Sequence, residues 1–263
     1  MKIAVFDSGL GGLSVLSHLQ REFPSFDYYY LGDTARTPYG TRSVSVVERY
    51  ANECLNFLNQ FEPDAIVIAC NTVSAVALKA LKQKFSVPLF GMIQPVVDFT
   101  LSQLKPKRVL LLGTPVTIES QLYNAAFLAG NGSLEIEAVS CPLFVPLVEN
   151  GLFEGQIVDQ VIDLYLNRYN STTRPDCVIL GCTHYPFLKP ALQKYFGTTS
   201  RLVECAEGVV CALTNQLVQA DSSRQGNGSV NFFVTDDIGR FNALSRQVVE
   251  HWGGAELITL ANS

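Results

Sequence analysis

The sequence predicts an α/β protein built from two similar α/β domains with mostly parallel sheets. Three observations support this: apolar strand-like runs alternate with helical segments, parts of the chain repeat, and 263 residues exceed the usual size of one domain. Charged residues make up only 16% of the chain, against about 25% in a typical soluble domain, so much of the sequence should be buried.

The first half contains three strand-like runs, each followed by a loop and a helical pattern. We expect strands at 3–6, 28–31 and 65–69, with helices ending near 21, covering 43–60, and ending near 85. Such alternation implies parallel strands with crossover helices on both faces of the sheet. Sheets of this kind bind ligands at the carboxyl ends of their strands.

Two stretches of the first half recur in the second half at similar spacing. Residues 2–8 correspond to 108–114, and the run from Pro63-Asp64 to Cys70 corresponds to the run from Pro175-Asp176 to Cys182. Strand-plus-turn patterns also recur by chance in α/β proteins, but the Pro-Asp to Cys match is harder to explain that way. A duplicated unit would place two equivalent strand ends, each carrying a cysteine, across a shared cleft.

The C-terminal part predicts a surface loop over 221–229 and then a strand over 230–234. Asp236 is a possible cap for a last helix, which we expect to return and pack on the first half.

Composition and targeting signals limit the partners to small molecules. The apolar runs are far shorter than the ~20 residues of a membrane-spanning helix, and no signal-peptide core follows Met1, so we expect a cytoplasmic protein without a membrane segment. A net charge of −5 and a pI near 5.2 make nucleic acid an unlikely partner. Seven cysteines without Cys-x-x-Cys spacing favour free thiols over disulfides.

Cys70 and Cys182 are the strongest candidates for chemistry. Each precedes an expected helix start, with Asn71, Thr72 or Thr183 as possible caps, and a helix N-terminus lowers the pKa of a thiol from about 8.5. We therefore expect a depressed pKa in at least one of them. Two thiols related by a repeat suit proton removal and return on opposite sides of one carbon. The other cysteines are expected to be inert core thiols: Cys54, Cys141, Cys177, Cys205 and Cys211.

The loop that begins with Asp7 and Ser8 matches neither dinucleotide-binding nor phosphate-binding glycine motifs. Asp7 would repel a phosphate, whereas a carboxylate beside a hydroxyl suits an ammonium group or a catalytic base. Either residue could instead be a plain helix cap. The loop over 34–40 is likewise either a long turn or a set of ligand contacts.

No cofactor is expected. His18, His184 and His251 lie far apart and fit no zinc spacing, so a metal site is unlikely. No lysine lies in the cysteine or Asp-Ser segments to anchor pyridoxal phosphate. His184 lies beside Cys182, where it would either cap the loop or relay a proton.

At these residues the sequence resembles the glutamate racemases of the aspartate/glutamate racemase superfamily. The matching segments span most of the chain in family order: residues 6–13, 32–40, 69–72, 113–117, 145–149 and 181–186. The resemblance implies two facing domains, 1–97 with 209–263 and 98–208, and an active site in the pseudo-symmetric cleft between them. It also implies a homodimer that makes D-glutamate for bacterial peptidoglycan, and hence for cell-wall biogenesis and cell shape.

Carried over by position, the resemblance assigns Cys70 as the base acting on D-glutamate and Cys182 as the base acting on L-glutamate. Asp7 would assist Cys70, with His184 and Glu149 assisting Cys182. The substrate would be held by Asp7, Ser8, Pro38, Tyr39, Gly40, Asn71, Thr72, Thr114, Thr117, Thr183 and His184. Val73 and Val96 stand where smaller residues are common, which affects pocket packing and the hinge.

Aspartate and hydantoin racemases are the nearest alternatives. His184, rather than an acidic residue, after Cys182-Thr183 favours glutamate by resemblance. A decarboxylase of this fold would keep only one of the two cysteines. A small-molecule-binding regulatory protein is the alternative from another class, because some relatives are reported to bind gyrase.

Overall fold

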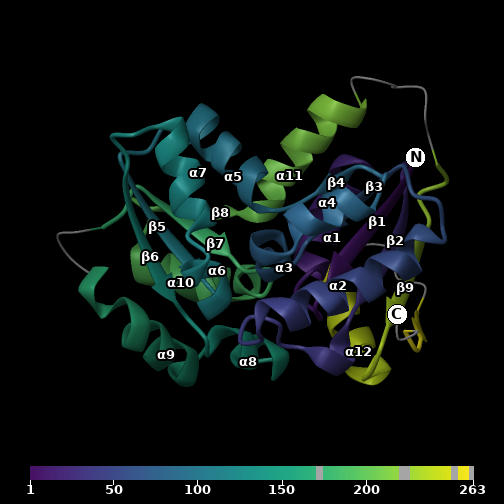
Figure 1. Ribbon diagram of the computed structural model, residues 1–263. Coiled ribbons are helices and arrows are strands. Elements are labelled where there is room, and N and C mark those ends of the chain that lie inside the picture. The colour runs from purple at the N-terminus through teal and green to yellow at the C-terminus, as the bar shows by residue number, and fades with distance from the viewer. Residues whose placement is uncertain (170–173, 219–225, 250–253, 261–263) are drawn as a thin grey trace.

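The computed structural model describes residues 1–169, 174–218, 226–249 and 254–260, and these residues form two separate parallel sheets (Figure 1). The first sheet has the order β10 (Ala255–Leu257), β9 (Val230–Val234), β2 (Asp27–Gly32), β1 (Lys2–Asp7), β3 (Ala65–Ile68) and β4 (Leu89–Phe90). The second has the order β6 (Glu135–Ser140), β5 (Arg108–Gly113), β7 (Cys177–Gly181) and β8 (Arg201–Glu204). All the described strand pairs run parallel, which confirms the predicted fold class.

Helices cover both sheets. They are α1 (Leu13–Glu22), α2 (Val44–Asn59), α3 (Asn71–Val76), α4 (Leu78–Lys84), α5 (Ile93–Phe99), α6 (Pro115–Glu119), α7 (Leu122–Gly130), α8 (Phe144–Glu149), α9 (Gln156–Leu166), α10 (Lys189–Phe196), α11 (Cys205–Leu213) and α12 (Ile238–Val248). Short 3₁₀ turns lie at Thr34–Arg36, Asn167–Tyr169 and Tyr185–Leu188, and π-helical turns at Thr100–Leu104 and Thr214–Val218. Among the described residues, no helix is both long enough and apolar enough to cross a membrane.

The helix expected after Cys70 is bent rather than continuous. It divides into α3 and α4 at Ala77, whose φ of −116° departs from helical values. The hydrogen bonds from Ala77 N to Val73 O and from Leu81 N to Ala77 O persist, so the bend is a local distortion within one helical run. Ala77 is fully buried at this position.

The internal repeat appears in the topology. Strand order β2-β1-β3-β4 in the first sheet matches β6-β5-β7-β8 in the second, with β9 and β10 added at one edge of the first. The Pro-Asp pairs explain part of the repeat: Asp64 Oδ2 accepts a 2.9 Å hydrogen bond from Lys2 N, and Asp176 Oδ2 accepts one of 2.9 Å from Arg108 N. Each aspartate therefore fixes the start of the central strand in its own half.

The C-terminal segment packs on the first half. Strand β9 pairs with β2, and α12 contacts α1. The N-cap of α12 is Asp237, whose Oδ1 accepts a 3.1 Å hydrogen bond from Arg240 N, so the expectation of Asp236 as the cap was wrong. Asp237 adopts a left-handed conformation that turns its carboxylate toward the helix start. Of the predicted loop, 221–225 lie outside the described residues. The domain boundaries themselves stay a prediction.

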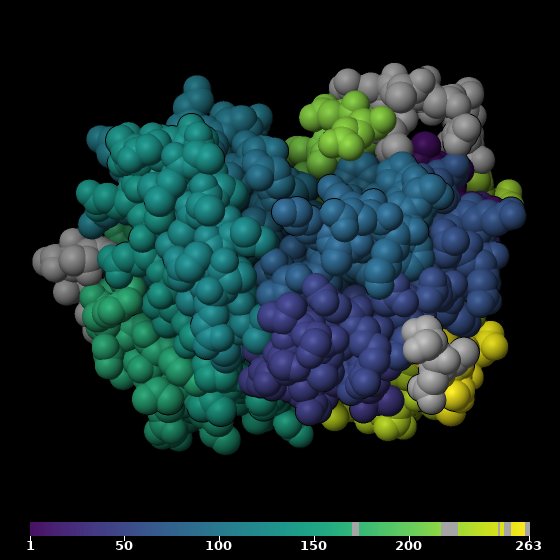
Figure 2. All heavy atoms as spheres, in the orientation of Figure 1, coloured from purple at the N-terminus to yellow at the C-terminus, as the bar shows by residue number. Residues whose placement is uncertain are grey.

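Helices α5 and α11 lie side by side between the two sheets (Figure 1). A Cβ atom on Gly208 would lie 2.5 Å from the backbone of Pro95, so only glycine permits this close packing. One hydrophobic cluster runs from the first sheet into the second, including Val5, Val67 and Ile179. The two halves are also in continuous contact over the face in Figure 2. The carboxyl ends of the central strands are thereby brought together.

Candidate active site

The two halves meet at a small cavity, with about 290 Å³ of empty space partly open to solvent, at the carboxyl ends of their central strands. Cys70 follows β3 and Cys182 follows β7, and both thiols line this one cavity. The lining residues are Ser8, Thr37, Pro38, Tyr39, Gly40, Cys70, Asn71, Thr72, Thr114, Val145, Cys182, Thr183 and His184. Most of the residues predicted from the sequence are therefore brought together here.

Three predicted residues lie one layer behind the lining. Asp7 contacts Thr183, Glu149 contacts His184, and Thr117 contacts Thr114. Conversely, Thr37 and Val145 line the cavity and were not predicted as site residues. Both lie in segments that carry the family resemblance, and Thr37 directly precedes Pro38, so adjacency was the available signal.

His184 connects Cys182 to Glu149. The Cys182 Sγ lies 3.8 Å from His184 Nδ1, and His184 Nε2 lies 2.6 Å from Glu149 Oε1. Burial lowers the pKa of His184, but its hydrogen bonds to Cys182 and Glu149 outweigh this and raise the pKa well above the usual value. Burial raises the pKa of Glu149, but the hydrogen bond to His184, the charges of His184 and Arg240 and the Leu10 backbone N–H together outweigh it, and the net shift is downward. The His184 imidazolium therefore lies beside the Cys182 sulfur.

Cys70 has a different environment. Its Sγ lies 3.5 Å from Ser8 Oγ, and its pKa is raised to about 12, first by burial and then by the negative charge of Asp7. Hydrogen bonds from Ser8 and from Val73 N oppose this shift only in part. The expectation that a helix start depresses the pKa was wrong for Cys70, because burial and Asp7 outweigh the effect of the short helix α3. The raised pKa favours the neutral thiol at Cys70.

The caps expected from the sequence also differ. Cys70 itself is the N-cap residue of α3, so Asn71 and Thr72 lie inside the helix. No α-helix starts directly after Cys182; a turn and the 3₁₀ segment Tyr185–Leu188 follow it. Thr183 does not cap, because its hydroxyl donates to Asp7.

Asp7 joins the two halves from a fully buried position. Its Oδ2 accepts a 3.0 Å hydrogen bond from Gly9 N, and its Oδ1 accepts one of 3.1 Å from the Thr183 hydroxyl. Burial raises the pKa of Asp7, and the charge of His184 opposes that shift. The charge of Asp7 therefore acts on Cys70 itself and on His184, which lies beside Cys182.

Further hydrogen bonds hold the cavity closed. Thr72 Oγ1 lies 3.0 Å from Thr114 Oγ1, and Val116 N donates to Gly40 O at 3.2 Å. A Cβ atom on Gly40 would lie 2.6 Å from the Cβ of Thr114, so this approach requires glycine. The Ser14 hydroxyl adds a 2.9 Å hydrogen bond to the carbonyl of Thr183.

The loop that carries Tyr39 and Gly40 is fixed by Asp33, which is fully buried. The Asp33 carboxylate accepts hydrogen bonds from the Tyr39 hydroxyl, from Arg36 Nε at 2.6 Å and from the Thr235 hydroxyl at 2.8 Å. These hydrogen bonds fix the loop as one wall of the cavity. The bond from Thr235 also connects the loop to the C-terminal segment.

Two polar atoms near the cavity lack partners. Asn71 Nδ2 and Thr37 Oγ1 are buried and have no hydrogen-bond partner among the described residues. Buried donors are seldom left unpaired, and an unpaired one calls for a structural or functional reason. Both residues line the cavity, so an anionic ligand would satisfy them.

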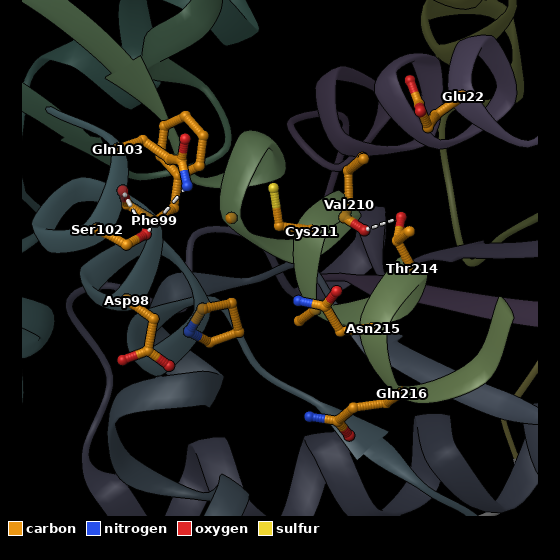
Figure 3. Close-up of a pocket in the computed structure, with 13 residues that line it drawn as sticks. Glu22, Asp98, Phe99, Ser102, Gln103, Val210, Cys211, Thr214, Asn215 and Gln216 are labelled. Carbon is orange, nitrogen blue, oxygen red and sulfur yellow. Dashed lines mark hydrogen bonds between the residues drawn. The ribbon is translucent and has the colours of Figure 1, made fainter. Parts of the chain in front are cut away.

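A larger cavity, with about 1040 Å³ of empty space partly open to solvent, lies away from these cysteines. It is a groove to which α1 contributes Glu22, α5 contributes Asp98 and α11 contributes Cys211 (Figure 3). Cys211 is exposed, so the expectation of a core thiol was wrong there, whereas Cys54, Cys141, Cys177 and Cys205 are buried. Among the described residues, the lining of the groove contains no second thiol and no histidine. The described residues also contain no group of three or more His, Cys, Asp or Glu side chains placed to hold a metal ion.

Comparison with known proteins identifies the family. Residues 12–213 match the model of the Asp/Glu/hydantoin racemases. A glutamate racemase from Aquifex pyrophilus is 42% identical over 236 residues, 90% of this chain and 89% of that protein. The crystal structure of a glutamate racemase isoform from Bacillus anthracis has a TM-score of 0.90 at 32% identity, covering 98% of this chain and 97% of the other. A Francisella tularensis glutamate racemase in complex with D-glutamate has a TM-score of 0.88 at 30% identity, covering 100% and 98% of the two chains. The family model, the sequence identity and the fold all point to the same family, and the chain belongs to the Asp/Glu/hydantoin racemases.

Proposed function

We propose that this chain is a glutamate racemase that interconverts L- and D-glutamate by moving the α-proton between Cys70 and Cys182. The observation that carries the proposal is that the two thiols come from equivalent strand ends of the two halves and line one cavity. Inversion at a carbon requires a base on one face and an acid on the other, and this arrangement supplies both.

The charges around the two thiols support an assignment of roles. The His184 cation lies beside the Cys182 sulfur, and the raised pKa keeps Cys70 as a thiol. In the L to D direction, Cys182 removes the α-proton and the Cys70 thiol donates its proton to the opposite face of the carbanion. In the D to L direction the roles reverse, with Asp7 assisting Cys70 and with His184 and Glu149 assisting Cys182.

Neutral donors, together with His184, are proposed to hold the substrate. The described lining residues include no arginine or lysine, so the carboxylates would be bound by hydroxyls, backbone N–H groups and the Asn71 amide. The residues proposed for this are Ser8, Pro38, Tyr39, Gly40, Asn71, Thr72, Thr114, Thr117, Thr183 and His184. Asp7, whose carboxylate accepts a hydrogen bond from Thr183, is proposed to bind the substrate ammonium. Glutamate, rather than aspartate, is supported by the glutamate racemases at 30–42% identity and by the D-glutamate complex of one of them.

The biological role follows from the resemblance. We propose that the enzyme acts in the cytoplasm as a homodimer and supplies D-glutamate for peptidoglycan synthesis, and hence for cell-wall biogenesis and cell shape. No specific observation favours a regulatory role or gyrase binding.

A direct assay tests the proposed reaction. The purified chain is incubated with L-glutamate, D-glutamate or L-aspartate, and the enantiomers are separated by chiral chromatography. We expect D-glutamate from L-glutamate and the reverse, with no product from the Cys70→Ala/Cys182→Ala double variant. Turnover of aspartate with silence on glutamate would identify an aspartate racemase instead, and binding without turnover would identify a sensor.

A further inference from the structure

Asn71, in the cavity wall, is contacted from behind by two side chains of the other half. Its Oδ1 lies 2.5 Å from the Tyr123 hydroxyl and 3.5 Å from the Cys205 sulfur, and these two partners lie 3.2 Å from each other. Tyr123 is on α7 and Cys205 begins α11, whereas Asn71 begins α3. All three side chains are buried, and neither Tyr123 nor Cys205 lines the catalytic cavity.

The contacts fix which way the Asn71 amide faces. A separation of 2.5 Å is normal for an O–H···O hydrogen bond and too short for N–H···O, so the amide oxygen faces Tyr123. Both partners remain donors: burial raises the pKa of Tyr123 well above its usual value and that of Cys205 to about 12. The Cys205 sulfur also lies 3.4 Å from the carbonyl oxygen of Leu180, which can only accept, so the thiol proton is shared among acceptors.

Holding the oxygen leaves the amide nitrogen free. Asn71 Nδ2 is buried without a partner among the described residues, and Asn71 lines the cavity. A free N–H donor next to a cavity whose described lining has no arginine or lysine suits a carboxylate oxygen. Rotation of the amide would present an oxygen to that carboxylate instead and would repel it.

We propose that Tyr123 and Cys205 are positioning residues for substrate binding: they hold the Asn71 amide so that Nδ2 donates to a carboxylate of bound glutamate. Because both come from the second half, this donor is set only when the two halves are together. The inference rests on the proposed glutamate racemase function.

The test uses a double-mutant cycle on the full-length enzyme with glutamate as substrate. Tyr123→Phe removes only the hydroxyl, and we expect KM for glutamate to rise about 10-fold while kcat changes less, as for a lost binding interaction. In an Asn71→Ala background the same substitution should have no further effect, because Tyr123 acts only through Asn71. Tyr28→Phe is the matched control: its buried hydroxyl donates to the carbonyls of Leu19 and Phe23, and KM should not change.

Cys205 gives a second series that does not depend on Tyr123→Phe folding. Cys205→Ala should raise KM for glutamate. Cys205→Ser keeps a hydrogen-bond donor, so its KM should be close to that of the wild type. An unchanged KM in Tyr123→Phe, or an equal rise in KM with and without Asn71, would overturn the positioning role while leaving the racemase function intact. Absence of glutamate turnover in the wild type would overturn the proposed function and this inference with it.

Discussion

The Cys182 sulfur lies 3.8 Å from Nδ1 of His184, whereas the Cys70 sulfur faces the Ser8 hydroxyl at 3.5 Å. One thiol therefore has a cation beside it, and the other has a hydroxyl and the nearby charge of Asp7. Two cysteines at equivalent strand ends thus have differently charged neighbours. This asymmetry suits a reaction that needs one thiolate and one thiol at the same time.

Glu149→Gln should move the alkaline limit of activity to lower pH. Glu149 helps to raise the pKa of His184, so the imidazolium persists below that raised pKa and is lost as pH rises through it. In the variant this loss occurs at lower pH, and kcat/KM should fall roughly 10- to 100-fold near neutrality in both directions. The pH profile of kcat/KM checks this, with Glu154→Gln, an exposed glutamate of the same half, as control. An alkaline limb that stays in place would contradict the role given to Glu149.

Cys70 should ionise only at high pH in the ligand-free enzyme. Its pKa of about 12 comes mainly from burial, which opposes the charged thiolate. The ultraviolet absorbance of thiolate, titrated in the wild type and in Cys70→Ala, should give a difference only well above pH ~8.5, the usual thiol pKa. Peptide-resolved alkylation by iodoacetamide should label the exposed Cys211 before Cys70. A difference titration centred at or below pH ~8.5 would be incompatible with the environment described for Cys70.

Activity should survive removal of metals and of pyridoxal phosphate. The proposed mechanism uses only side chains of this chain, and the described cavity lining contains no lysine to form a Schiff base. Racemisation is measured after treatment with EDTA and hydroxylamine, followed by removal of the reagents. Loss of turnover that returns on adding either a metal ion or pyridoxal phosphate would refute this prediction. Oxidation of the thiols should inactivate the enzyme.

Glu204 should make the free energy of unfolding fall as the pH is lowered through the acid range. It accepts hydrogen bonds from His18 at 3.0 Å and from Lys189. Burial raises its pKa, but these partners outweigh burial and lower it from 4.5 to about 2. A lowered folded-state pKa stabilises above the unfolded value, so a contribution of up to about 3 kcal/mol is lost as pH falls from 4.5 toward 2.

Urea unfolding across that pH range checks the role of Glu204. The wild type and Glu154→Gln should lose unfolding free energy more steeply than Glu204→Gln as pH falls, because the variant has no carboxylate to protonate at this position. Parallel slopes for all three proteins would show that Glu204 does not carry the effect.

The elements were predictable where apolar runs carry a local signal. Strands β1, β2, β3 and β9 begin and end within one residue of the expected positions, because each is a short buried run bounded by polar residues or turns. The bend at Ala77 was not predictable, since the helical pattern of the sequence continues through it.

The site was predictable in its composition but not in its contacts. Motifs placed Cys70 and Cys182 at strand ends, and family resemblance added most of the cavity lining. The hydrogen bonds from Thr183 to Asp7 and from Tyr123 to Asn71 arise only when the halves dock, so no local pattern encodes them. The raised pKa of Cys70 has the same origin, because tertiary packing decides its burial.

The two-base assignment itself is tested most directly by deuterium exchange in single cysteine variants. Each variant should lose racemisation in both directions by about 10²- to 10⁴-fold or more, because one face lacks its acid or base. The remaining thiol can still remove a proton on its own side and return one from solvent. We therefore expect Cys182→Ala to exchange the α-hydrogen of D-glutamate in deuterated water, and Cys70→Ala that of L-glutamate, each without inversion. Exchange by both variants on the same enantiomer, or full racemisation by either, would contradict the assignment of Cys70 and Cys182 to opposite faces of the substrate.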